Sequence, residues 1–365
     1  MRRSTKIKLR QLLVIILVWM FFGLMLTIYD HLVLHSLNSA GVSLEYSFSI
    51  SAIRNIGAGL IGGLLGGSLL VFYINVRYQD KPYAHTILAV FFGFILVVGI
   101  ITVVMAFTLV PLKTHRPLSD PHTQAALIDF FLDPTPLKQG LVWSFIVGIT
   151  QLFLQVSYKF GQGSFWNIIF GKYQIPKMET KIFMFLDLNS STAMAERLGN
   201  EKYHLFLRDF FADITQPILE NKGIIYQYVG DEVVISWNFI DGIEKNNCIR
   251  CFFDIKQKIQ EKEDRYIGKY GVLPSFKAGI HCGKVVVGEI GIIKRDITYS
   301  GDVLNTTARV QGMCKEFNVE LIASGNLIDE LKSLGNYLTS PLGFIKLRGK
   351  SLEISLNELR LLGSI

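Results

Sequence analysis

The chain has 365 residues, of which 50% are hydrophobic and only 18% are charged, and its formal net charge is +7. This composition is too apolar for one water-soluble globule, and the apolar excess lies in the first 160 residues. Five of the first ten residues are basic, so the positive charge favours contact with a membrane surface and gives no indication of a nucleic-acid partner.

Four long apolar runs occupy the first half of the chain. Each approaches or exceeds the ~20 residues that a helix needs to cross the hydrocarbon core of a bilayer. The runs cover residues 11–29, 56–76, 86–110 and 140–158. We therefore expect residues 1–158 to form a membrane domain of four transmembrane helices, with the lipid bilayer as its partner.

The first apolar run follows a basic tail, as it would in a secretory signal peptide. Its apolar core is long, however, and no small-x-small cleavage site follows it, which favours an uncleaved anchor. By the positive-inside rule the tail stays in the cytoplasm, and four crossings return the chain to that side. We therefore expect a protein of the inner (plasma) membrane whose N-terminus and second half are cytoplasmic. Residues 111–139, which contain several prolines, should form the larger external loop.

The second apolar run contains Gly59, Gly63 and Gly67, spaced four residues apart. Glycine at this spacing lets two helix backbones approach closely in lipid. The stripe is typical either of a dimer face between two chains or of packing within one four-helix bundle, and the sequence leaves both open.

Residues 159–177 separate the apolar half from the rest of the chain. An aromatic cluster around Phe165 and Trp166 is followed by Pro176. The segment is either a short helix on the bilayer surface or the first packed element of the second half. In both cases it is a juxtamembrane linker, or transducer, through which any signal from the membrane helices must pass.

Residues 178–365 alternate between strand and helix patterns, which predicts an α/β sandwich with helices over a mostly antiparallel sheet. Strands are expected at residues 181–188, 224–229, 233–237, 276–281, 284–290, 320–323, 342–347 and 353–356, and helices at 192–199, 201–220, 242–262 and from 302 onward. All four cysteines lie in this half. Cys248 and Cys251 have no second ligand pair, which favours buried thiols over a zinc site.

Two carboxylates in this half occupy unusual positions. Asp187 lies near the end of the apolar strand 181–188, and Asp231 follows Gly230 in the turn of a hairpin. A carboxylate that ends a buried strand is costly unless it is paired or holds a cation. If the hairpin lies beside that strand, the two carboxylates converge and, with main-chain carbonyls and substrate phosphates, would hold Mg²⁺ or Mn²⁺.

The segment from Asp296 to Arg309 predicts a strand end, a tight turn and a helix with Asp302 as its N-cap. Asn305 and Arg309 are four residues apart and therefore share one helix face. An amide and a permanent cation that project together suit a phosphate group, although a solvated helix face has the same pattern.

Together these motifs resemble the catalytic domain of class III nucleotidyl (adenylyl and guanylyl) cyclases. The resemblance covers about half of the chain and depends on separate motifs in the right order. They are Phe185–Asn189, Gly230–Asp231, Thr298–Arg309 and Leu347–Lys350. The resemblance implies an α/β (α+β, ferredoxin-like) catalytic domain. It also implies a homodimer, because in this family the metal aspartates of one subunit face the Asn and Arg of the other.

The resemblance implies two-metal catalysis. Two Mg²⁺ or Mn²⁺ ions at Asp187, Leu188 and Asp231 would bind the triphosphate of ATP and help to activate the ribose 3′-hydroxyl. The two ions would stabilise both the attacking and the leaving oxygens. Attack on the α-phosphorus would give 3′,5′-cyclic AMP and pyrophosphate.

The resemblance also implies roles for the positions that contact the substrate. Asn305 would orient the ribose, Arg309 would offset the charge that develops at the α-phosphate, and Lys350 would hold the terminal phosphates. At the base-reading pair, where adenylyl cyclases often carry Lys and either Asp or Thr, this chain has Gln227 and Thr298. Gln can both donate and accept hydrogen bonds, so the pair is compatible with adenine, and guanine remains an alternative.

The leading hypothesis is a membrane-bound adenylate cyclase that acts on ATP as a homodimer. A guanylate cyclase acting on GTP is the nearest alternative, and a catalytically weak receptor that keeps the cyclase fold is the next. A diguanylate cyclase has a similar Gly-Asp-Glu hairpin, but this chain lacks the second Gly of that motif and carries the additional block at residues 296–309.

Overall fold

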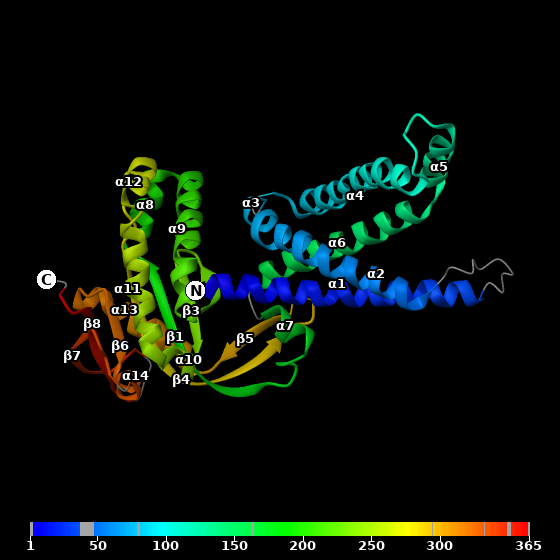
Figure 1. Cartoon of the computed structure of the whole chain (residues 1–365). Helices are drawn as coiled ribbons and strands as arrows, with labels where there is room; N and C mark the ends of the chain where they lie inside the picture. Colours follow the sequence, from blue (N-terminus) through cyan, green and yellow to red (C-terminus); the bar gives the residue numbers. More distant parts are fainter. Residues whose placement is uncertain are drawn as a thin grey trace. The chain divides into compact units, whose positions relative to one another are not determined.

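The computed structural model describes residues 3–36, 47–78, 81–161, 164–293, 295–331, 333–348 and 352–363. The chain divides into two compact units, Thr5–Phe160 and Gly161–Ile365 (Figure 1). The first unit contains the long apolar helices, and the second contains the β-sheet.

Four of the described helical stretches are long and apolar enough to cross a membrane, as predicted. These stretches are Thr5–Leu34, Phe48–Arg77, Tyr83–Ile100 and Pro121–Lys159. The helices of this unit are α1 (Arg3–Ser36), α2 (Phe48–Ser68), the π-helical segment η1 (Leu69–Ile74), α3 (Asn75–Arg77), α4 (Tyr83–Thr114), α5 (Pro121–Leu132) and α6 (Thr135–Phe160).

The segment predicted as an external loop, residues 111–139, is mostly helical. α4 continues through Pro111 to Thr114, and α5 begins at Pro121. The Asp120 carboxylate caps α5 by accepting a hydrogen bond from the His122 amide at 2.9 Å. Proline suits the first helical position because it has no amide hydrogen to satisfy, so Pro121 marks the start of a helix here.

The glycines of α2 pack against α1 within the same chain. A Cβ on Gly59 would lie 2.5 Å from the Trp19 carbonyl oxygen, and one on Gly63 would lie 2.9 Å from the Cα of Ile16. Only glycine lets two helix backbones come this close. The structure therefore favours packing within one bundle as the explanation of the glycine stripe.

The second unit is built on an eight-stranded sheet with the order β2-β3-β1-β4-β6-β8-β7, and β5 pairs with β4 beside this path. The described strand pairs are antiparallel except β4 with β6. The strands are β1 (Lys177–Leu188), β2 (Ile224–Val229), β3 (Glu232–Asn238), β4 (Phe276–Ile290), β5 (Asp296–Ser300), β6 (Leu321–Ser324), β7 (Tyr337–Ile345) and β8 (Ile354–Leu361). The predicted fold class, a mostly antiparallel sheet with helices, is confirmed.

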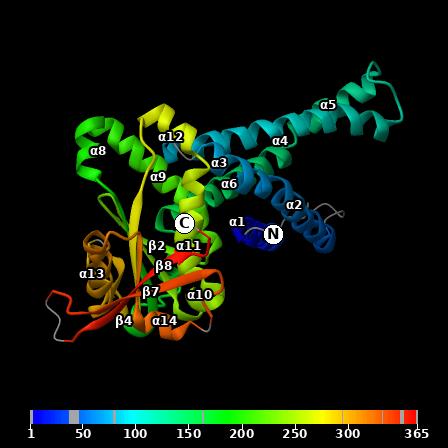
Figure 2. The ribbon, with the colours of Figure 1, turned by 90° about the vertical axis from the view of Figure 1, so that its left-hand side faces the viewer.

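Helices cover both faces of this sheet (Figure 2). α9, α11 and α12 contribute apolar side chains to the core on one face, and α13 contributes to the cores on the other. The helices of the second unit are α7 (Ser164–Ile169), α8 (Ser191–Leu198), α9 (Asn200–Glu220), α10 (Phe239–Ile243), the 3-10 turn η2 (Glu244–Asn246), α11 (Asn247–Gln260), α12 (Glu263–Tyr270), α13 (Asp302–Phe317) and α14 (Gly325–Glu330).

The central strand β1 is buried on both faces, as its apolar run predicts. Ile182 and Met184 belong to the core beneath α9 and α11, whereas Phe183 and Phe185 belong to the core beneath α13. This division follows from the alternation of side chains along a strand. Asp187, two residues after Phe185, is therefore held at the end of a tightly packed strand.

One continuous strand, β4, replaces the two strands predicted at residues 276–281 and 284–290. Gly283 lies between the two predicted strands but does not interrupt β4. Its lack of a side chain makes room for α13. A Cβ on Gly283 would lie 2.6 Å from Cγ2 of Val303, and one on Gly279 would lie 2.3 Å from the Gln311 amide nitrogen. These two glycines let α13 lie directly on β4. The last two strands, β7 and β8, are also longer than predicted.

The linker is partly packed into the second unit. After the short helix α7, Tyr173 is buried in the same core as Phe183 and Val287, and its carbonyl accepts a hydrogen bond from the Glu289 amide at 3.1 Å. Residues after α7 therefore form a packed element of the second unit, whereas Trp166 and Phe170 of the aromatic cluster are exposed. The role of this cluster as a linker stays a prediction.

The four cysteines are buried free thiols, as expected. Burial raises the pKa of the Cys248 thiol to about 12, which keeps it protonated at neutral pH. Cys248 and Cys251 both belong to the core beneath α11. The spacing of these two residues therefore reflects helix packing.

Candidate active site

Asp187 and Asp231 lie together at one end of the central strands. The antiparallel pairing of β1 with β3 sets Asp187 opposite Glu232. Gly230 begins the preceding turn with φ +64°, a conformation that glycine adopts at little cost. The two carboxyl groups interact, because the charge of Asp231 contributes to the raised pKa of Asp187. The structure therefore brings together the two carboxylates that the sequence indicated.

This cluster carries more negative charge than the surrounding protein neutralises. Burial raises the pKa of Asp187, and the neighbouring Asp231 carboxylate raises it further, against the opposing effects of Lys277 and Gln311. The pKa of Glu232 rises to about 7, first because of burial and then because of the two aspartates. A bound cation would reverse these effects by favouring the ionised carboxylates.

The residues fit a divalent cation. Oδ2 of Asp231 is buried and has no hydrogen-bond partner among the described residues, and carboxylate oxygens are the ligands that Mg²⁺ prefers. In the described part of the chain, no three His, Cys, Asp or Glu side chains form a metal-binding group. A metal at this position would therefore also need main-chain carbonyls, such as that of Leu188 at the end of β1, and oxygens from a ligand.

Two further side chains reach Asp187, and the local sequence pattern indicates neither. Nε2 of Gln311 donates a hydrogen bond to Oδ2 of Asp187 at 3.2 Å, and Nζ of Lys277 lies 3.7 Å from the same oxygen. Lys277 is directly opposite Asp187 in the pairing of β1 with β4, so knowledge of the strand order would have identified it. Gln311 is recognised only through the close approach of α13 to the sheet.

Asn305 and Arg309 lie on α13 but face away from Asp187. Two residues correspond to about 200° around an α-helix, so Arg309 projects from the side opposite Gln311, which contacts Asp187. Asn305 is exposed and Arg309 is partly exposed. Arg309 takes part in none of the ion pairs among the described residues. One chain therefore does not bring its own Asn305 and Arg309 to its own aspartates.

The turn before α13 differs from the prediction. Gly301, with φ 148°, occupies the N-cap position, and Asp302 is the first helical residue. The Asp302 carboxylate accepts a hydrogen bond from the Thr306 hydroxyl at 3.4 Å. Its negative charge still lies in the first turn, where it interacts favourably with the helix dipole.

Gln227 and Thr298 lie on β2 and β5, next to two tyrosines that join these strands. The Tyr226 and Tyr299 rings are 4.7 Å apart, and the Tyr299 amide donates to the Tyr226 hydroxyl at 3.5 Å. Gln227 is exposed, and the Thr298 hydroxyl donates to the Gly288 carbonyl at 3.4 Å. The Gln227 amide is therefore available to an external ligand.

The last expected site residue, Lys350, lies outside the described residues. Leu347, three residues earlier, is buried against the α13 core. This contact fixes the chain before Lys350 against the helix that carries Asn305 and Arg309.

Comparisons with known proteins place this part of the chain in a known family. Residues 174–357 match the family described as the adenylate and guanylate cyclase catalytic domain. Adenylate cyclase 2 of Rhizobium meliloti (strain 1021) is 35% identical over 206 residues, which cover 56% of this chain and 57% of that protein. Adenylate cyclase 1 of the same organism is 29% identical over 182 residues, which cover 48% of this chain and 26% of that protein. The chain thus spans little more than half of the first relative and about a quarter of the second.

The fold is similar to that of a solved structure described as a bacterial light-regulated adenylyl cyclase. The TM-score is 0.52 at 20% identity, and the match covers 63% of this chain and 65% of that chain. This likeness supports the predicted cyclase-type α+β fold.

Proposed function

Because the chain belongs to the family of adenylate and guanylate cyclase catalytic domains, we propose that it converts ATP to 3′,5′-cyclic AMP and pyrophosphate. The observation that carries this proposal is the juxtaposition of Asp187 and Asp231, with Asn305 and Arg309 on the opposite side of the adjacent helix. The names of two relatives, both adenylate cyclases, support ATP as the substrate.

Asp187 and Asp231, with the main chain at Leu188, would hold two divalent ions, Mg²⁺ or Mn²⁺. Such ions make the ribose 3′-hydroxyl easier to deprotonate and offset charge on the attacking and leaving oxygens. The unpartnered, buried Oδ2 of Asp231 supports this assignment. Gln311 would keep the Asp187 carboxylate oriented through its hydrogen bond to Oδ2.

The remaining polar residues would bind the rest of ATP. Arg309 would offset the charge that develops at the α-phosphate, and Asn305 would orient the ribose. Lys277, a cation 3.7 Å from Asp187, would contact the triphosphate close to the metal-binding carboxylates, and Lys350 would hold the terminal phosphates. The 3′-oxygen then attacks the α-phosphorus, and the bond from that phosphorus to pyrophosphate breaks.

The working enzyme would be a homodimer. Arg309 points away from the aspartates of its own chain, so a second copy would have to supply the missing half of the site. A symmetric pair of chains would contain two such composite sites.

The base preference depends on Gln227 and Thr298. Gln227 can donate to N1 of adenine and accept from its amino group, which makes adenine the better match. Guanine is the alternative, because the same amide can turn to accept from the N1–H and amino groups of that base.

The long apolar helices would anchor the enzyme in the plasma (inner) membrane. Four crossings that start from a basic N-terminal tail would keep both the N-terminus and the catalytic unit in the cytoplasm. The anchor would then raise the local concentration of catalytic units and favour their pairing.

The direct test is product identification. Membranes containing the full chain are incubated with ATP or GTP in the presence of Mn²⁺, and the nucleotide products are separated chromatographically. Cyclic AMP from ATP, lost in Asp187→Asn, is the expected result. Cyclic GMP from GTP as the main product would make the protein a guanylate cyclase. Absence of any cyclic nucleotide from a folded chain would favour a receptor that keeps only the fold.

A further inference from the structure

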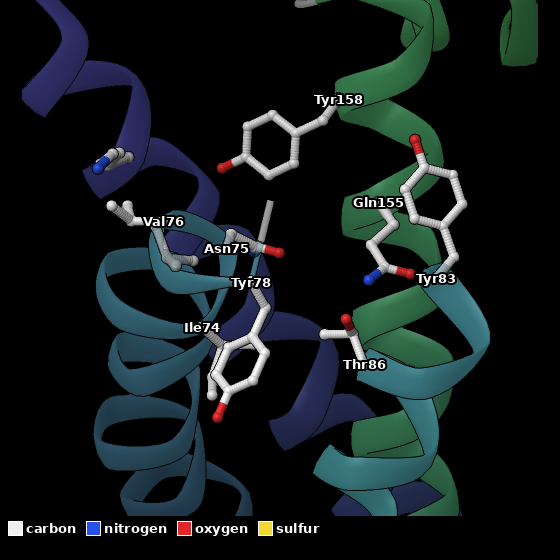
Figure 3. Close-up of a pocket in the computed structure, with 10 residues that line it drawn as sticks. Ile74, Asn75, Val76, Tyr78, Tyr83, Thr86, Gln155 and Tyr158 are labelled. Atoms are coloured by element: carbon white, nitrogen blue, oxygen red, sulfur yellow. The ribbon is translucent and has the colours of Figure 1, made fainter. Parts of the chain in front are cut away.

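The helical unit contains a cavity at the end where α1 begins and α6 ends (Figure 3). Its volume is about 350 Å³, within the range of ~300–1,000 Å³ typical of small-molecule sites. α1, the segment from η1 to α3, the start of α4 and the end of α6 all contribute to its lining. No aspartate or glutamate is among the described lining residues, so the cavity has no built-in negative charge.

Gln155 on α6 places an unsatisfied amide oxygen at this cavity. Its side chain is 7% exposed, and Oε1 has no hydrogen-bond partner among the described residues. Figure 3 shows the amide directed into the space between the helices. A buried polar group without a partner destabilises the fold. A ligand hydroxyl that donates to Oε1 would remove this destabilisation.

Asn75 also lines the cavity and has an unsatisfied amide donor. Nε2 of Gln151 donates a hydrogen bond to Oδ1 of Asn75 at 3.0 Å. The other end of the Asn75 amide, Nδ2, has no hydrogen-bond partner in the described structure. Asn75 directly follows the π-helical segment η1. Such segments are rare and occur frequently at functional sites.

Lys8 gives the cavity a positive charge. It is the one cation among the described lining residues, and its Nζ lies 5.7 Å from the centre of the Phe72 ring. Lysine and tyrosine near helix ends are also common as plain interfacial anchors. That role does not account for Gln155, whose side chain is buried and whose amide oxygen has no partner among the described residues.

We propose that this cavity binds the headgroup of an anionic glycerophospholipid with a free hydroxyl, the chemistry of phosphatidylglycerol. The phosphodiester oxygens accept hydrogen bonds from Lys8 and from Nδ2 of Asn75, and a glycerol hydroxyl donates to Oε1 of Gln155. The acyl chains lie along the neighbouring apolar surface, where Phe72 and Val76 are exposed. A wholly apolar ligand would leave Gln155 unsatisfied, and a zwitterionic choline headgroup has no hydroxyl to donate.

The test uses the full chain reconstituted in vesicles of equal amounts of phosphatidylglycerol and phosphatidylcholine. After extraction into detergent, native mass spectrometry counts the lipids that remain bound. The wild type should retain phosphatidylglycerol in preference to phosphatidylcholine. Gln155→Leu and Asn75→Leu should each weaken this retention about tenfold, which corresponds to 1.4 kcal/mol. Gln155→Glu, which keeps the shape but adds a negative charge, should abolish it.

The matched control is Tyr73→Phe, because Tyr73 is exposed on the neighbouring turn but does not line the cavity. It should retain lipid as the wild type does, and all variants should elute identically in gel filtration. Equal retention of both lipids by the wild type would overturn the proposal, as would unchanged retention in the Gln155 and Asn75 variants. Competition by millimolar glycerol 3-phosphate or inorganic phosphate would identify a soluble phosphate as the ligand and would also overturn the lipid assignment.

Discussion

Gln311 donates a hydrogen bond to Asp187 at 3.2 Å, while Arg309 projects from the opposite side of the same helix. α13 is thereby fixed against the strand that carries the candidate metal ligand. Gly279 and Gly283 allow this close packing, so Arg309 could turn towards Asp187 only if α13 left the sheet. The proposed reaction therefore requires the aspartates of one copy and the Arg309 of another.

Asp187→Ala and Arg309→Ala should each be nearly inactive alone, with kcat lowered about 10²–10³-fold or more. When the two variants are co-expressed, a mixed dimer contains one intact composite site. Random pairing should then restore about a quarter of the wild-type activity. Cyclic AMP production per milligram of enzyme measures the recovery.

The matched control for this experiment is co-expression of Asp187→Ala with Asp231→Ala. Both substitutions damage the same half of the site, so every site of the mixed dimer stays defective. Recovery in this control, or its absence in the first pair, would contradict a site shared between two chains.

Lys277→Met should raise the KM for ATP about 10–100-fold, because a hydrogen bond to a charged group contributes ~1.5–3 kcal/mol. Lys277→Arg should retain most of the affinity, since it keeps the positive charge beside Asp187. The control is Lys284→Met, which removes an exposed lysine from the same strand away from the carboxylates. An unchanged KM in Lys277→Met would exclude Lys277 from substrate binding.

Local sequence pattern was sufficient for part of the site. The apolar run before Asp187 and the turn residue Gly230 predict a buried strand and a hairpin, and the structure has both. The convergence of Asp187 with Asp231 follows because β3, the second strand of that hairpin, pairs with β1. The fold class followed from the same patterns of strand and helix.

The contacts of Lys277 and Gln311 could not be read from local pattern, because they depend on tertiary packing. Lys277 meets Asp187 only through the pairing of β1 with β4, whose partners are far apart in the sequence. In the same way, Gly283 suggests a strand break from the sequence, but the glycine is there because α13 packs directly over it. Pro121 suggests a loop, although an Asp followed by Pro, as at Asp120 and Pro121, is also typical of a helix start.

Gln227→Glu should shift substrate preference from ATP towards GTP. A carboxylate only accepts hydrogen bonds, so it cannot donate to N1 of adenine but can accept from the N1–H and amino groups of guanine. We expect the ratio of kcat/KM for ATP to that for GTP to fall about tenfold, a difference of 1.4 kcal/mol. Steady-state kinetics with each nucleotide measures this ratio. An equal loss with both nucleotides would indicate that Gln227 does not read the base.

Asp209→Asn should destabilise the catalytic unit in a pH-dependent way. Burial alone would raise the pKa of Asp209, but hydrogen bonds from Lys269 and Tyr270 and the charge of Arg265 outweigh it and lower the pKa. The ionised carboxylate therefore stabilises the fold above its unfolded pKa of about 3.9, and this stabilisation is lost as the pH falls through the lower folded value.

The temperature of half-inactivation should accordingly be lower for Asp209→Asn than for the wild type at pH 7. The two should converge as the incubation pH is lowered below about 4, with cyclase activity assayed afterwards at neutral pH. Glu261→Gln is the control, because Glu261 forms an exposed pair with Lys258 at one end of α11. A constant difference between Asp209→Asn and the wild type at every pH would exclude the carboxylate charge as its cause.

Gly59→Leu should disrupt the helical unit, whereas Gly57→Leu should not. A Cβ on Gly59 would lie 2.5 Å from the Trp19 carbonyl oxygen of α1, while one on Gly57 would have no neighbour within 4 Å. Overpacking of this kind typically costs about 1–3 kcal/mol, and backbone contacts leave less room to relax. Thermal unfolding and gel filtration of the detergent-purified chains measure the effect. If Gly59→Leu instead kept a folded bundle and only separated dimers into monomers, the glycine stripe would lie between chains and not between α1 and α2.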